Sequence, residues 1–466
     1  METLQRTANR GSISTGYDID NSVKIEPAND EGLHFTPSST TNTDTFTFSC
    51  WFKRTEISNQ LNTLFGSYTD GSNHAIFRFK TDDTLELRFV TTGTGKIIVS
   101  DMLFRDTSAW YHMVLAVDTS IYPSTDRVKV YINGEQITLT GGYPNTNQDC
   151  IGINTASKAM NVGYISNFSD IEFAGYIAEA HHIDGSQLAP TDFGETDEDS
   201  GIWKPKAYTG SYGTNGFYLD FESSGSLGAD SSGNGNDFTL NNITSADQAT
   251  DTPTNNFATM TEAWAYASQL EVRWGGTLTT TNTAAWSGAK STIGVNKGKW
   301  YWEIRWNDTI STYTGIQTQG EDNISASGSA AHSRNTSLSI GAGSKYRTYI
   351  NGTDTLYTSQ PSGNISTGEV TGFALDLDSG TKTLKLIRSG SVVQTYTLTD
   401  SLATEYVFPF CSTYAQTLVW NLGGFFHYTL SSAETDANGL GSFEFSPTIG
   451  GVNYYALCTK NLALYG

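Results

Sequence analysis

The sequence lacks closely spaced cysteines and long apolar runs, and it has few basic residues. Its four cysteines (Cys50, Cys150, Cys411 and Cys458) are far apart, so no CxxC pair of the zinc-binding kind exists. We interpret them as thiols of a chain that folds in a reducing compartment without needing disulfides. No run of about 18 apolar residues occurs, so we expect no membrane-spanning helix.

Basic residues are scarce: 27 Lys and Arg stand against 48 Asp and Glu, which gives a net charge of −21. Phosphate backbones and anionic membranes would repel such a chain, so we expect neither nucleic acid nor membrane among its partners. The N-terminal METLQRTANRGSISTG has no apolar core of the kind found in secretory signals. A composition typical of extracellular proteins without an export signal suggests a chain made in a host cytoplasm and released by lysis in a virus particle.

Aromatic and turn-forming residues are abundant, with 24 Tyr, 23 Phe and 46 Gly. Apolar residues alternate with polar ones in several segments, including 46–52, 128–132 and 300–306, which is the period of a strand with one buried face. Asn133-Gly134 follows one of them and predicts a type I′ hairpin turn. We therefore predict an all-β fold with two antiparallel β-sandwich domains in tandem.

The alternation is confined to two regions, which predicts five segments. We expect an attachment arm at 1–17, a first sandwich at 18–195 and a second sandwich at 261–425. A polar connector rich in Gly, Asn and Asp at 196–260 would join the sandwiches. A tail at 426–466 would pack on the second module.

The first sandwich resembles a laminin-G-like module of the concanavalin A-like, jelly-roll class. The resemblance lies in five segments in the family's order: TFTFSCWFKR, WYHMVLAVD, RVKVYINGEQI, AMNVGYI and FAGYIAEAHHIDGSQLAPTDFGE. These segments look like the versions found in structural proteins of marine tailed phages. The connector sequence YTGSYGTNGFYLDFESSGSLGADSSGNGNDFTLNNIT is similar to those proteins as well.

The second sandwich resembles a SPRY domain over about 285–425. The matching segments are GKWYWEIRW, Tyr349-Ile350-Asn351-Gly352, GEVTGFALDLDSGTKTLKL and VFPFCSTY followed by LVWNLG. The sequence departs from the family at Thr371, where an aliphatic residue is usual, and in the insertion-prone stretch 317–345. Because SPRY binding surfaces lie in variable loops, the resemblance implies recognition but no particular ligand.

Together the two resemblances imply a virion-surface protein of a tailed bacteriophage, such as a tail fibre, spike or capsid fibre. Its expected partners are other virion proteins and a host cell-surface polysaccharide, and we expect a homo-oligomer because sandwich edge strands invite pairing. The alternative is a purely structural decoration protein that contacts the virion without binding glycan.

Calcium is the one cofactor that the laminin-G resemblance implies. Asp230, Asn234, Asn236 and Asp237 form the densest set of candidate oxygen ligands. The competing interpretation is that these side chains only satisfy the backbone of their own turns.

A carbohydrate platform is the second predicted site, because sugars stack on exposed aromatic rings. Our candidates for ligand binding are Tyr68, Trp110, Tyr164, Trp264 and Trp274. Packing in the core or between modules is the competing role of such large side chains.

A catalytic site is not evident. The concanavalin A-like glucanases carry their carboxylates in an E-x-D-x-x-E pattern, and no such run occurs. The adjacent His181 and His182 would point to opposite faces of a strand and cannot chelate one metal ion together. We therefore predict that the protein is not an enzyme, and a polysaccharide depolymerase is the least favoured hypothesis.

Overall fold

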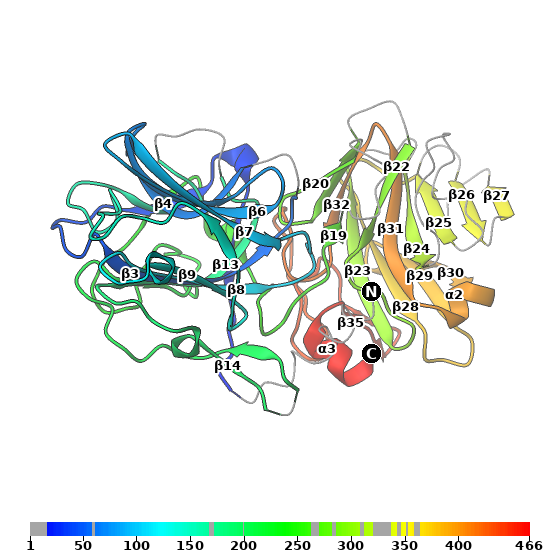
Figure 1. Ribbon diagram of the computed structural model, residues 1–466. Helices are drawn as coiled ribbons and strands as arrows, with labels where there is room; N and C mark the ends of the chain where they lie inside the picture. Colours follow the sequence, from blue (N-terminus) through cyan, green and yellow to red (C-terminus); the bar gives the residue numbers. More distant parts are fainter. Residues whose placement is uncertain are drawn as a thin grey trace. The chain divides into compact units, whose positions relative to one another are not determined.

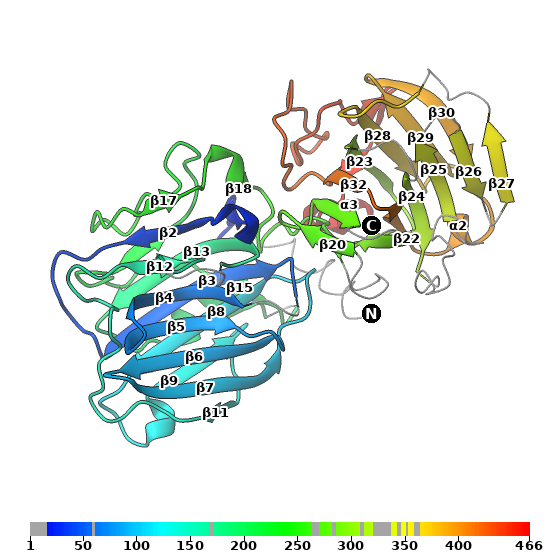
Figure 2. The ribbon, with the colours of Figure 1, turned by 90° about the horizontal axis from the view of Figure 1, so that it is seen from above.

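The computed structural model describes residues 16–57, 61–166, 172–198, 200–261, 270–281, 286–307, 312–319, 337–342, 346–350, 353–357 and 364–466. Nearly all of the regular structure is β-strand, arranged in two compact units (Figures 1 and 2). The N-terminal unit spans Ser14–Asn255 and the C-terminal unit spans Asn256–Gly466. The predicted all-β fold with antiparallel sandwiches in tandem is confirmed.

The N-terminal unit is built from two large antiparallel sheets, which we name A and B. Sheet A contains, in spatial order, β10 (Glu135–Gln136), β9 (Val128–Ile132), β8 (Tyr111–Asp118), β3 (Thr45–Arg54), β13 (Gly175–Asp184), β1 (Ser22–Ile25) and β18 (Gln248–Ala249), and β16 (Phe217–Leu219) also pairs with β13. Sheet B contains β11 (Leu139–Gly141), β7 (Thr94–Leu103), β6 (Thr84–Thr91), β5 (Asn73–Phe79), β4 (Asn62–Asp70), β12 (Met160–Val162), β2 (Gly32–Phe35) and β17 (Thr239–Asn241). Shorter elements are β14 (Gly194–Thr196), β15 (Trp203–Pro205), η1 (Pro27–Asn29), η2 (Ser124–Asp126), η3 (Pro190–Asp192) and η4 (Ser245–Asp247).

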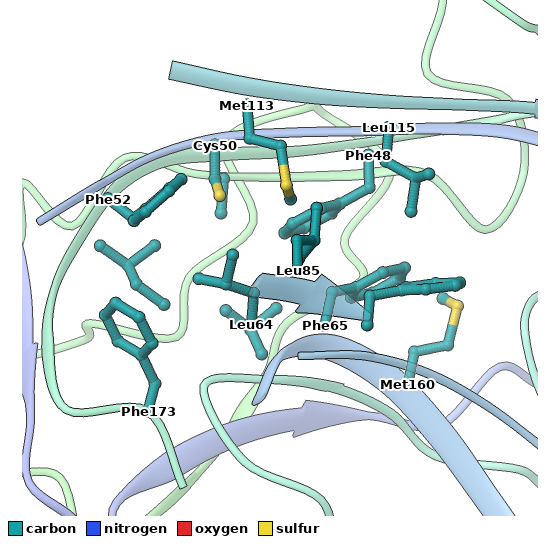
Figure 3. Close-up of a cluster of buried hydrophobic side chains, with 14 of the residues drawn as sticks. Phe48, Cys50, Phe52, Leu64, Phe65, Leu85, Met113, Leu115, Met160 and Phe173 are labelled. Carbon is teal, nitrogen blue, oxygen red and sulfur yellow. The ribbon is translucent and has the colours of Figure 1, made fainter. Parts of the chain in front are cut away.

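The core of the N-terminal unit lies between these sheets (Figure 3). Phe48, Cys50 and Phe52 of β3 point inward, and the ring of Phe48 stacks on Phe65 of β4 with centroids 4.2 Å apart. Because successive residues of a strand face opposite sides, Trp51 and its polar neighbours lie on the outer face of sheet A. The alternation read from the sequence therefore separates the core from the face that carries the candidate site.

Two predicted hairpin turns are confirmed. Asn133 and Gly134 join β9 to β10 with φ angles of 49° and 86°, as a type I′ turn requires. Ser389 and Gly390 join two strands of the C-terminal unit with φ angles of 48° and 73°.

Residues 196–255 belong to the N-terminal unit and differ in this from the predicted separate connector. Three short strands of this segment (β16, β17 and β18) extend sheets A and B. Lys53 is buried against Asp251 at 2.8 Å, and Lys24 is buried against Asp247 at 2.9 Å. A buried cation needs such a partner, so these ion pairs tie the segment to the sandwich.

The C-terminal unit also contains two antiparallel sheets, C and D. Sheet C contains β19 (Met260–Thr261), β22 (Trp286–Ser291), β31 (Val407–Tyr414), β24 (Thr312–Thr318), β25 (Ser337–Ala342), β26 (Tyr346–Ile350) and β27 (Thr353–Tyr357). Sheet D contains β20 (Leu270–Arg273), β21 (Leu278–Thr281), β32 (Thr417–Asn421), β23 (Lys299–Trp306), β28 (Val370–Asp376), β29 (Thr383–Arg388) and β30 (Ser391–Thr397). The remaining elements are α2 (Asp400–Thr404), β33 (Thr448–Ile449), β34 (Val452–Asn453), β35 (Tyr455–Ala456) and α3 (Thr459–Tyr465).

The last forty residues pack on the outer face of sheet D through a single buried acid. β35 pairs in parallel with β23, and the carboxylate of Glu303 on β23 is fully buried. It accepts hydrogen bonds from Tyr301 Oη (3.0 Å), Asn421 Nδ2 (3.0 Å) and the backbone N–H groups of Glu444 and Phe445 (2.8 Å each). Within the described residues, no helix has the length and apolarity that a membrane crossing requires.

Candidate functional site

A cluster of tyrosines around one carboxylate lies on the outer face of sheet A. We name the set of Tyr17, Glu179, His181, Tyr212 and Tyr218 the tyrosine–glutamate site. The hydroxyl of Tyr218 donates to Glu179 Oε1 at 2.7 Å, and the hydroxyl of Tyr17 donates to Glu179 Oε2 at 2.8 Å. The two hydroxyl groups lie 2.9 Å apart. The site therefore presents a polar centre framed by rings.

A β-bulge in β13 puts Glu179 on this face. The pairing of β13 with β3 runs through Ala178 opposite Trp51 and resumes at His181 opposite Ser49, so β13 holds one extra residue. Ile177 points into the core, and an unbroken strand would direct Glu179 inward as well. The bulge instead turns the carboxylate outward, at the cost of a φ of +50° that only Gly and Asn adopt readily. Strain of this kind clusters at functional sites.

Stacked rings surround the carboxylate. The ring of His181 lies 4.3 Å from that of Tyr218 at an interplanar angle of 9°, and 6.0 Å from that of Tyr212 at 16°. The hydroxyl of Tyr212 is 3.0 Å from His181 Nδ1. Tyr17, Tyr212 and Tyr218 are each half-buried, whereas Glu179 and His181 are buried. The tyrosines thus offer partly open rings above a buried acceptor.

The site is electrostatically negative. Burial raises the pKa of Tyr17, Tyr212 and Tyr218 far above the usual value, so these hydroxyl groups stay protonated and act as donors. The neighbouring Asp220 raises the pKa of Glu222, and Glu179 adds to the same effect. A neutral, hydroxyl-rich ligand suits this field better than an anion.

The Asx residues predicted to bind calcium position this site. Asp230 accepts the backbone N–H of Tyr218 through Oδ1 at 2.9 Å and that of Asn236 through Oδ2 at 2.8 Å. Asn234 and Asn236 each donate through Nδ2 to the carbonyl of Gly216, at 2.9 and 2.8 Å. Their contacts hold the segment that carries Tyr212 and Tyr218.

These contacts do not suit a calcium ion. Ca²⁺ needs six to eight converging oxygen ligands, whereas both oxygens of Asp230 already accept loop donors and Asp237 Oδ1 accepts the backbone N–H of Asp230. In the part of the chain that the structure describes, no three His, Cys, Asp or Glu side chains are placed to hold a metal. The calcium assignment stays a prediction.

The predicted aromatic residues of the N-terminal unit lie outside the tyrosine–glutamate site. Trp110 is buried and donates from Nε1 to Asp251 at 3.0 Å. Tyr164 is buried with its hydroxyl 2.6 Å from His34 Nδ1. Tyr68 is half-buried beside His74. Neither Trp110 nor Tyr164 presents an open ring, and ligand binding by these three residues stays a prediction.

The other two predicted residues belong to the C-terminal unit. Trp274 is half-buried, follows β20 with a φ of +52°, and its ring contacts that of His427. Trp264 lies outside the described residues. In contrast, Trp300 and Trp302 are fully buried, which confirms that they are core residues.

Sequence reasoning missed all five residues of the tyrosine–glutamate site. Glu179 looked isolated because its partners are 39 and 162 residues away along the chain. The prediction that His181 and His182 face opposite sides is confirmed, since His181 stacks on Tyr218 while His182 packs against Phe46 of the core. That split was the only sequence signal that pointed to an aromatic outer face.

Comparisons with known proteins agree with the fold. Residues 27–183 match a laminin-G family model described as the concanavalin A-like lectin/glucanases superfamily, so the N-terminal unit contains a domain of that class. Among curated proteins none matches the chain. No enzyme family is indicated by the matched domain, whose class name includes lectins and glucanases.

Three solved structures similar to parts of the chain illustrate its likeness. The PSpry domain of TRIM65 is 15% identical, with 35% of this chain and 89% of that chain covered and a TM-score of 0.29. A native heptameric SAP-like pentraxin from Limulus polyphemus is 16% identical, with 37% and 80% covered and a TM-score of 0.29. The SPRY domain of human HERC1 is 12% identical, with 34% and 96% covered and a TM-score of 0.28.

Proposed function

We propose that this chain is a non-catalytic binding protein on the virion surface of a tailed bacteriophage, and that its N-terminal unit binds a host-surface glycan. The observation that carries the proposal is the tyrosine–glutamate site, where half-buried tyrosines frame the buried carboxylate of Glu179. The virion placement rests on the sequence resemblance to phage structural proteins.

The site has the groups that sugar recognition uses. The rings of Tyr212 and Tyr218 provide apolar surface for the C–H face of a pyranose, and their hydroxyl groups and Glu179 provide donors and acceptors for its hydroxyl groups. A homo-oligomer would display several copies of the site. Multivalent contact would then raise weak single-site affinity by orders of magnitude, about 10²–10⁴-fold.

The proposal is tested with an array of host-surface and reference glycans, probed with the purified chain and with its Tyr212→Ala and Tyr122→Ala variants. Tyr122 is the matched control because it lies in the same unit and is 90% exposed. We expect Tyr212→Ala to lose about tenfold in affinity, since one aromatic contact contributes about 1.5 kcal/mol, and Tyr122→Ala to bind normally. An arm with EDTA tests the predicted calcium requirement.

Equal loss in both variants would contradict the assignment of the site. The absence of binding to any glycan would favour the alternative role, in which the chain decorates the particle and contacts only other virion proteins.

A further inference from the structure

The C-terminal unit carries a second aromatic surface, assembled from three separate segments. We name Trp274, Arg305, Phe426, His427 and Tyr428 the arginine–aromatic patch. The Trp274 ring contacts His427, the His427 and Tyr428 rings are 5.2 Å apart, and the Phe426 and Tyr428 rings are 5.9 Å apart. The guanidinium of Arg305 lies 3.7 Å from the centre of the Tyr428 ring. All five side chains are half-buried, so they form one continuous, partly open surface.

Arg305 is unusual in so acidic a chain, because it contacts a ring and forms no ion pair with any described residue. Its Nε atom is buried without a hydrogen-bond partner. The acid two residues earlier on β23, Glu303, is engaged by the C-terminal segment. Stacking on Tyr428 fixes the plane of the guanidinium, so its N–H groups are held ready for an external acceptor.

The acids nearest in the fold are already neutralised by other arginines. Glu369 receives the Nε and Nη2 groups of Arg388 at 2.6 and 3.0 Å, and Glu271 pairs with Arg273 at 2.6 Å. The net charge of −21 therefore acts on this patch mainly from farther away. Salt screens such charges over about 8 Å at physiological ionic strength.

We propose that the arginine–aromatic patch binds a saccharide that bears a carboxylate. The planar guanidinium of Arg305 pairs with a carboxylate through two parallel hydrogen bonds, and the Trp274 and His427 rings take the apolar face of the sugar. Asn307, whose Oδ1 lies 3.4 Å from the Tyr428 hydroxyl, adds an amide beside the same ring. This inference adds a second site of opposite charge preference to the glycan binding proposed for the N-terminal unit.

The test measures binding of the full chain to galacturonate, glucuronate and N-acetylneuraminate oligosaccharides, each compared with its methyl ester. The ester keeps the sugar ring and removes the charge, so the comparison needs no variant. The variant Arg305→Gln removes the cation of the patch. Arg273→Gln is the matched control, because it removes an equal charge from the residue next to Trp274, where the arginine is paired with Glu271.

We expect at least one acid to bind about tenfold or more tightly than its ester, as a charged hydrogen bond of about 1.5 kcal/mol requires. Arg305→Gln should abolish that preference and Arg273→Gln should keep it. Equal binding of acid and ester, binding untouched by Arg305→Gln, or binding only to an acidic peptide would each overturn the proposal. Failure here leaves the tyrosine–glutamate site untouched, because Tyr212→Ala is read out on neutral glycans.

Discussion

Acid should destabilise the N-terminal unit through a histidine that the fold keeps neutral. His112 on β8 is 1% exposed and stacks on Trp51 with centroids 4.8 Å apart. The indole Nε1 of Trp203 donates to His112 Nδ1 at 3.0 Å, which requires an unprotonated nitrogen there. Burial, with a smaller contribution from His181, lowers the pKa of His112 to about 3.

The sign of the effect follows from the two protonation states. The unfolded chain takes up a proton on His112 as the pH falls below about 6.5, whereas the folded unit does so only near pH 3. Folding stability is therefore complete above about pH 6.5 and is lost progressively below it. Each pH unit corresponds to about 1.36 kcal/mol, so the loss reaches about 3 kcal/mol at about pH 4.5.

The assay compares the wild-type chain with His112→Asn, which cannot titrate, by urea unfolding at two pH values, 7.5 and 4.5. We expect the stability advantage of the wild type to shrink by about 3 kcal/mol between them. His427→Asn in the C-terminal unit is the control and should leave the N-terminal transition unchanged. An advantage that is equal at both pH values would refute the reasoning, because it would mean that His112 binds protons equally in the folded and unfolded states.

Two further substitutions test single buried features. Burial raises the pKa of Glu303 to about 7 against hydrogen bonds that favour the anion, so its stability contribution is lost as the pH rises from about 4.5 to 7. The free energy of unfolding of Glu303→Gln relative to wild type should then rise by about 3 kcal/mol over that range, and a constant difference would argue against a raised pKa. At the bulge, Glu179→Gly should be more stable than Glu179→Ala by about 1 kcal/mol in urea unfolding, because of the φ of +50°; equal stability would show that the backbone there is unstrained.

Local patterns predicted the strands and turns because those depend on neighbouring residues. The alternation at 46–52 identified the buried face of β3, and Asn133-Gly134 identified the hairpin that follows β9. The same locality explains the error in dividing the chain. Residues 196–255 look like a connector because their strands are only two or three residues long, and what anchors them is long-range pairing and buried ion pairs such as Lys53–Asp251.

The candidate site escaped prediction because a β-bulge creates it. One extra residue in β13 reverses the face of Glu179, and no pattern in GYIAEAHHID marks the position of that residue. The Asx-rich loop was identified correctly as a functional neighbourhood in the sequence. Its side chains, however, spend their donors and acceptors on the segment that carries Tyr212 and Tyr218.

The central claim, glycan binding by the tyrosine–glutamate site, is tested most directly by a crystal structure of the chain with a saccharide that it binds. The account predicts a sugar ring against Tyr212 and Tyr218, with a hydroxyl group within hydrogen-bonding distance of the Glu179 carboxylate. A saccharide seated on another surface of the N-terminal unit, or a chain that binds no neutral saccharide at all, would contradict it.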